Sequence, residues 1–108
     1  MYSFPLEKNE SIIKKSMATI QKDENTSIGA LYLTNERLVF VGYMGPAVTS
    51  LWWLEVPLEH IDRLAPDKTF YLLDNVIDID TIRGDAVKII VRDRDSWLNA
   101  IKEQTEKL

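Results

Sequence analysis

The apolar residues of this chain follow two different periods, and the change between them constrains the fold more than any other feature. Up to residue 91 they stand in short runs that alternate with polar residues or are continuously apolar, separated by turn-forming stretches. Such runs, rich in β-branched and aromatic residues, are typical of strands. The predicted strands span 11–22, where a helix is the alternative, 28–34, 38–43, 50–58, 69–73, 76–82 and 86–91.

The runs 28–34 and 38–43 are apolar at nearly every position, which favours central strands covered on both faces. A short polar stretch containing asparagine joins them, so we expect a hairpin. Pro57 cannot donate to a strand ladder, so 50–58 is expected to be an edge strand or to end there. Residues 59–64 are expected to be an irregular connection in which Ile61 and Leu64 contact the core.

The last fifteen residues change to a helical period. Asp93 or Asp95 is the expected N-cap of a helix over 95–107, accepting hydrogen bonds from unpaired backbone donors. A helix this short needs to dock its apolar stripe. We therefore predict a mainly β (α+β) fold, a partly closed barrel of about seven bent antiparallel strands capped by one C-terminal helix. The predicted stripe comprises Trp97, Ala100, Ile101, Gln104 and Leu108.

Composition narrows the class of protein. The 108 residues suit one domain, 1–108, and the absence of cysteine excludes a disulfide framework and a thiolate zinc site. Thirteen basic and seventeen acidic residues give a net charge of −4, which argues against nucleic acid as a partner. With no visible signal peptide or membrane-spanning run, the expected location is cytoplasmic, with peripheral membrane association as the alternative.

One dozen residues resembles a known family. The run GALYLTNERLVF at 29–40 is similar to the signature of GRAM domains, which belong to the pleckstrin-homology-like superfold. The resemblance implies that fold and a non-enzymatic function in protein or lipid recognition. Weaker similarities elsewhere extend it along most of the chain; they lie at Phe4, Leu6, Glu10–Ile12, Val56–Ile61, Ile79, Thr81, Gly84 and Trp97.

The signature residues also have physical interpretations. Gly29 permits a close backbone approach or a bulge. Thr34 and Asn35 suit a hairpin turn, since asparagine tolerates positive φ. The apolar members of the signature are expected in the core; they are Leu31, Leu33, Leu38 and Phe40.

The inventory for catalysis and metal binding is thin. His60 is the only histidine, and a Ser–His–Asp arrangement would need it beside Ser27, Ser50 or Ser96 and an acid such as Asp62. No local signature supports that, so we expect a structural histidine, no enzyme and no cofactor. The acids at 74, 78, 80 and 85 lack the spacing of a calcium loop. We expect them to form a solvated acidic edge, with Asp78 and Asp80 on one face of a strand.

Phosphoinositide recognition by this superfold uses basic residues on the first two strands and their connecting loop. Here the loop, 22–27, contains one lysine and two acids, and the second strand has no basic residue before Arg37. Lys14 and Lys15 are adjacent and point to opposite faces of a strand. The sequence therefore predicts no inositol-phosphate site.

The candidate interaction surface is an apolar segment followed by consecutive tryptophans. Trp52 and Trp53 cannot enter the same core, so one of them faces the helix, a partner or solvent. No lysine or arginine lies between Leu38 and Asp62, so anionic lipid gains little there. We expect a protein partner or a homo-oligomer, formed through the Trp53 side or an exposed strand edge, and no small-molecule substrate. A membrane lipid bound through 43–50 is the alternative. The surface comprises Tyr43, Met44, Pro46, Val48 and Trp53.

Overall fold

The computed structural model describes residues 4–22, 25–44, 51–67 and 75–108. These residues form seven strands, one turn of 3-10 helix and one α-helix. In chain order the elements are β1 (Ile12–Lys22), β2 (Asn25–Thr34), β3 (Arg37–Met44), β4 (Leu51–Pro57), η1 (Leu58–His60), β5 (Ile61–Asp67), β6 (Val76–Thr81), β7 (Ala86–Val91) and α1 (Arg94–Glu106).

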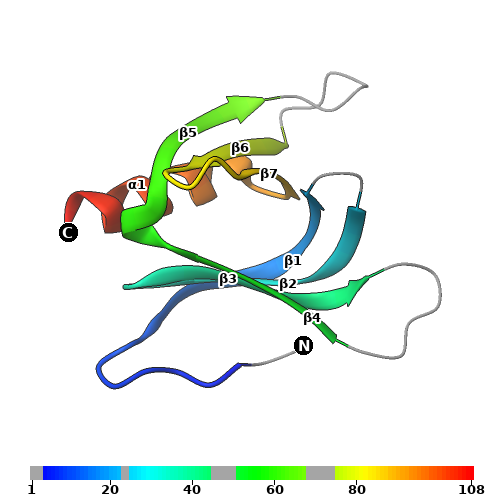
Figure 1. Cartoon of the computed structure of the whole chain (residues 1–108). Coiled ribbons are helices and arrows are strands. Elements are labelled where there is room, and N and C mark those ends of the chain that lie inside the picture. Colours follow the sequence, from blue (N-terminus) through cyan, green and yellow to red (C-terminus); the bar gives the residue numbers. More distant parts are fainter. Residues whose placement is uncertain (1–3, 23–24, 45–50, 68–74) are drawn as a thin grey trace.

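The strands form one antiparallel sheet in the order β4-β3-β2-β1-β7-β6-β5. The sheet curls over, so that β1 to β4 make one layer and β5 to β7 the other, with α1 at one end (Figure 1). The predicted architecture, bent antiparallel strands capped by a C-terminal helix, is confirmed. Because β4 and β5 are the two ends of the sheet, the barrel stays open between them.

The core lies between the layers and follows the strand alternation. Every second residue of β6 and β7 enters it, as the period of two predicts. Trp97 of α1, 1% exposed, plugs one end of this core, which confirms that the helix docks on the sheet. The largest buried core side chains are Trp97, Phe40, Ile20, Leu31, Leu33, Leu58, Ile77, Ile79 and Ile101.

The opposite face of β2 and β3 carries a second apolar cluster. Ala30, Tyr32, Val39 and Val41 are buried there, and the ring of Phe4 packs edge-on against Tyr32 with centroids 4.9 Å apart. Around these four residues both strands are thus covered on two faces, as their continuous apolar runs predicted, but Ile28 at the other end of the β2 run is 66% exposed. We call this side of the sheet its outer face.

Gly29 is required by a close approach of β2 to β3. A Cβ atom at this position would collide with the carbonyl oxygen of Val41 and the Cα of Gly42, both backbone atoms that cannot swing away. The expectation of a close backbone approach at Gly29 is confirmed.

The sequence prediction was wrong for 59–64, where residues from Ile61 onward form the edge strand β5. The register of β5 against β6 shifts between Ile61 and Arg63, so Ile61 and Leu64, three residues apart, both pack on the core. This irregularity removes the period of two from the sequence and conceals the strand. The strand predicted at 69–73 lies outside the described residues.

The helix departs from its prediction at both ends. Asp93 is the N-cap residue but has left-handed geometry, φ 54° and ψ 44°, and its side chain makes no capping bond. Asp95 lies inside the first turn. At the other end α1 stops before Leu108, which is 67% exposed rather than part of the stripe. Leu98, not predicted, is buried instead.

Candidate functional site

The N-terminal strap, residues 4–10, lies over the outer face of β2 and β3 without forming a strand. It is held by the side chain of Asn35, by an ion pair between Glu10 and Arg37, and by the packing of Phe4 on Tyr32. The Asn35 side chain accepts a hydrogen bond from the Ser11 backbone amide at 2.8 Å and donates one to the Asn9 carbonyl at 3.1 Å. Asn35 therefore holds the strap through its side chain, and it does not have the positive φ that the sequence suggested; Asn9 does, at 68°.

The centre of the strap is a buried ion pair. The Glu10 side chain is fully buried, and its Oε2 accepts hydrogen bonds from Arg37 Nε at 2.8 Å and from Thr34 Oγ1 at 2.6 Å. Its Oε1 accepts from Arg37 Nη2 and from the Glu7 amide, both at 2.8 Å. Arg37 also donates to the Pro5 carbonyl at 3.0 Å. Every carboxylate oxygen is thus hydrogen-bonded, which is the condition for a buried charge to be tolerated.

Two further contacts complete the surroundings of Arg37. Its Nη1 forms an ion pair with Glu55 Oε2 of β4 at 3.0 Å, and its guanidinium lies 5.1 Å from the centre of the Phe4 ring. Thr34 Oγ1 accepts hydrogen bonds from the amides of Glu36 and Arg37, both at 3.0 Å, which confirms its place in the β2–β3 turn. The polar residues of the signature therefore hold the strap to the sheet.

The electrostatics follow from this geometry. The bidentate hydrogen bonds from Arg37 lower the pKa of Glu10 from 4.5 to about 2, against the opposing effect of burial. The same bonds raise the pKa of Arg37. Glu10 is therefore charged at every physiological pH.

This pKa predicts an acid-sensitive stability. Because the pKa of Glu10 is lower in the folded chain than its ordinary value of 4.5, the pair stabilises the fold fully above pH 4.5. That contribution, about 3 kcal/mol, should disappear progressively as the pH falls from 4.5 to 2. Urea unfolding at several pH values measures it. A Glu10→Gln variant should show a much flatter profile in this window, and equal slopes in the two proteins would contradict the assignment.

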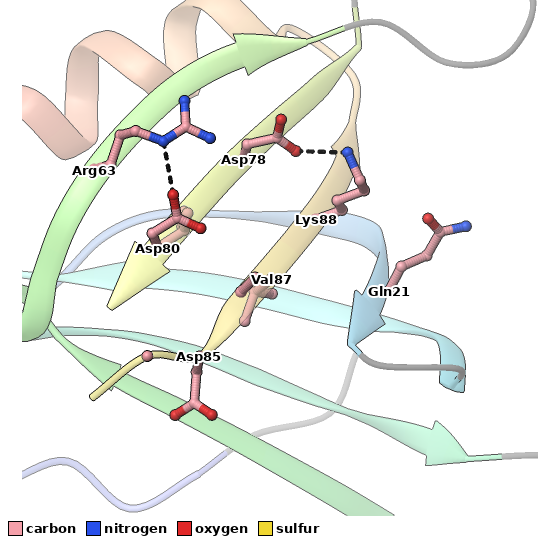
Figure 2. A pocket seen from close by; sticks show the side chains of 10 residues that line it. Gln21, Arg63, Asp78, Asp80, Asp85, Val87 and Lys88 are labelled. Carbon is pink, nitrogen blue, oxygen red and sulfur yellow. Dashed lines mark hydrogen bonds and ion pairs between the residues drawn. The ribbon is translucent and has the colours of Figure 1, made fainter. Parts of the chain in front are cut away.

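A second feature is a charged hollow of about 530 Å3 on β5, β6 and β7 (Figure 2). Arg63 Nε donates to Asp80 Oδ2 at 2.7 Å, and Lys88 Nζ lies between Asp78 Oδ1 at 3.0 Å and Asp67 Oδ2 at 3.2 Å. Asp78 and Asp80 lie in the same hollow, as predicted for one face of a strand. Their carboxylates raise the pKa of Lys88 and of Arg63.

The acids of this hollow are therefore bonded to cations of neighbouring strands. Cross-strand pairs of opposite charge stabilise a sheet by about 0.2–1 kcal/mol each. Among the described residues no group of acids or histidine is arranged to hold a metal ion.

His60 is half-buried in η1, and its carbonyl oxygen accepts a hydrogen bond from the Ile82 amide at 2.9 Å. Of the serines considered for a triad, Ser27 is buried in β2 and its hydroxyl has no hydrogen-bond partner among the described residues, whereas the Ser96 hydroxyl accepts a bond from Lys14 at 3.1 Å. Ser50 lies outside the described residues. The Thr81 hydroxyl, which lines the same hollow as His60, accepts from the backbone of the β6–β7 turn. In the described part of the chain His60 is thus not joined to an activated nucleophile.

The lysines of β1 are engaged within the chain. Lys14 lies 5.5 Å from the centre of the Trp97 ring and bonds to Ser96, and Lys22 forms an ion pair with Asp85 at 3.8 Å. A phosphate ligand would need basic side chains on β1, and two of the three lysines of this strand are already bound to other groups of the chain.

The predicted interaction surface is described only in part. Tyr43 and Met44 belong to β3 and Trp53 to β4, where their backbones pair, but their side chains are outside the description. Pro46 and Val48 lie outside the described residues altogether.

Sequence reasoning missed an apolar patch that adjoins this surface. Met17, Ile28 and Ile90 line an open hollow of about 280 Å3 on the outer face. Met17 is 51% and Ile28 66% exposed. In the ladder Ile28 pairs with Tyr43 on one side and with Thr19 on the other, and Thr19 pairs with Ile90. We call Met17, Ile28 and Ile90 the outer patch.

A curled seven-stranded sheet closed at one end by a helix defines a pleckstrin-homology-like module. The GRAM domain model matches residues 1–106, so the chain belongs to the GRAM domain family, whose members are protein- or lipid-interaction modules. The chain is also similar to the crystal structure of the C-terminal domain of an unknown protein from Leishmania infantum. The TM-score is 0.73 at 17% identity, over 91% of this chain and 86% of that one. No curated protein matches, and none of the described helices is long and apolar enough to cross a membrane.

Proposed function

We propose that this protein is a non-enzymatic recognition module that binds protein, and that its outer patch, continued toward Tyr43 and Trp53, packs on a second copy of the chain. The observation that carries the proposal is the exposure of Ile28 and Met17 on neighbouring strands of the outer face. Contiguous exposed apolar side chains mark interaction surfaces, whereas single ones are ordinary.

The second copy is favoured by the composition of the same face. The centre of the outer patch is apolar, and sheets pack face to face through such surfaces. Toward β7 and β6 the face carries Lys88 with Asp78 and Asp67, charges of both signs. A self-complementary interface of this kind avoids the repulsion that a rim of one sign would create between identical copies.

Sedimentation velocity over a range of concentrations tests the proposal. Ile28→Lys should abolish concentration-dependent association, because a lysine at the centre of the patch would have to be desolvated. Trp53→Lys tests the part of the surface where side chains are not described, with the same expected loss. The matched control is Ile82→Lys, since Ile82 is 62% exposed in the turn that follows β6 and its substitution should leave association unchanged. A wild-type chain that stays monomeric would contradict the proposed self-association.

The rival function is peripheral lipid binding through 43–50. Co-sedimentation with vesicles containing phosphatidylserine separates the two. Binding abolished by Met44→Asp, together with a monomeric mass, would favour the lipid function. The engagement of Lys14 and Lys22 within the chain supports the protein function, because anionic lipid is attracted by free cations near the surface.

A further inference from the structure

The two edges of the sheet are protected to different degrees. At one edge β5 has a register shift between Ile61 and Arg63, a proline at position 66 and several charged side chains. Irregularities, prolines and charges are the usual means of preventing a strand from being added to an edge. At the other edge, β4 has the sequence LWWLEVP, with one charged residue and a proline only at its end. The single charge, Glu55, is held by Arg37.

A hollow of about 280 Å3 runs beside β4. Its near wall is residues 54–57 of β4, and its far wall comes from elements that do not pair with β4: Lys22 of β1, Val87 of β7, and Arg83 and Asp85 of the β6–β7 turn. His60 and Thr81 also line it, and the bond from the Ile82 amide to the His60 carbonyl joins η1 to the end of β6. Among the described strands only β3 pairs with β4, so the other edge of β4 borders this space, which side chains bound.

The size and lining of this hollow favour a peptide chain. Its volume is just below the range of roughly 300–1,000 Å3 that is usual for drug-sized ligands. Leu54, Val56 and Val87 provide an apolar part, and the backbone of β4 provides the hydrogen-bonding groups of an edge strand. An extended peptide uses both, because its main chain pairs with the edge while alternate side chains enter the hollow.

The charges around the hollow specify the partner further. Lys22 pairs with Asp85, and Glu55 pairs with Arg37. Arg83 is exposed, and within the described residues its guanidinium makes no ion pair. The charge left for a partner is thus a guanidinium, which binds carboxylates with two parallel hydrogen bonds.

We propose that β4 accepts an extended, carboxylate-bearing segment of another protein as an eighth strand, with the carboxylate bound by Arg83. This inference rests on the proposed function in protein recognition, but it uses a different surface from the outer patch. The two can therefore fail separately.

The test uses the full-length chain and a displayed library of random twelve-residue peptides. Enriched peptides should contain aspartate or glutamate within an alternating apolar pattern. Binding should slow amide exchange in residues 54–56 of β4. Arg83→Gln should weaken binding at least about tenfold, because a charged hydrogen bond is lost. The matched control Arg92→Gln, another exposed arginine that follows β7, should not.

Three results would overturn the inference. One is a library that yields no enriched peptide; another is an Arg83→Gln variant that binds as tightly as the wild type. The third is slowed exchange around Met17, Ile28 and Ile90 instead of β4, which would support the proposed function while rejecting β4 as the site. Slowed β4 exchange in a chain that remains monomeric would support the inference and reject self-association.

Discussion

An Arg37→Met variant should lose about 3–5 kcal/mol of unfolding free energy, the cost of removing one partner from a buried ion pair. Methionine leaves the fully buried Glu10 carboxylate with only the Thr34 hydroxyl and the Glu7 amide. A folded protein has a total stability of roughly 5–15 kcal/mol, so this loss should be a large fraction of the unfolding free energy. Equilibrium urea denaturation followed by circular dichroism measures the loss.

Arg63→Met is the matched control. Arg63 also pairs with a carboxylate, that of Asp80, at 2.7 Å, but the two side chains are 57% and 41% exposed. An exposed pair contributes about 0–1 kcal/mol. Adding Glu10→Gln to Arg37→Met should recover part of the loss, because the buried charge is then removed. Equal losses in the two arginine variants would show that the strap pair is no more than a surface interaction.

Trp97→Ala is expected to cost about 3–5 kcal/mol, the range for truncating a buried aromatic residue. Trp97 is 1% exposed and fills the end of the core, and Lys14 Nζ lies over its ring, 5.5 Å from the centre. Its removal leaves a cavity between α1 and the sheet, so the helix should also become less protected than the strands. Urea denaturation and amide exchange in Arg94–Glu106 measure the two effects.

Leu108→Ala provides the comparison for α1, since Leu108 is exposed and lies beyond the end of the helix. It should change the unfolding free energy by less than about 0.5 kcal/mol. If Trp97→Ala lowered the unfolding free energy as little as Leu108→Ala, this would contradict the packing of α1 against the core.

Most strands of this fold could be predicted because their burial pattern is local. In β6 and β7 the residues that enter the core are every second one, so the period appears directly in the sequence. The exception, β5, shows the limit. Its register shift places Ile61 and Leu64 on one face although three residues separate them, and no period of two survives.

The candidate sites were less predictable than the fold. The apolar content of 43–53 predicted an interaction surface in that segment. The outer patch, in contrast, combines single residues from β1, β2 and β7, each of which lies in an ordinary strand pattern. The strap pair had a signal in the sequence, since Glu10, Thr34 and Arg37 all belong to the family resemblance. Their meeting could not be derived, because 27 positions separate the two charges.

The amino-acid pattern alone determined that this chain forms short strands and one final helix, that the middle parts of β2 and β3 are buried on both faces, and that Gly29 permits close contact. Each of these depends on neighbours along the chain or on the next strand of a hairpin. Tertiary structure decided which charges meet, which edge of the sheet is left unprotected and where apolar side chains gather on the outer face. Those outcomes depend on the order and register of strands distant in sequence, and no local period carries that information.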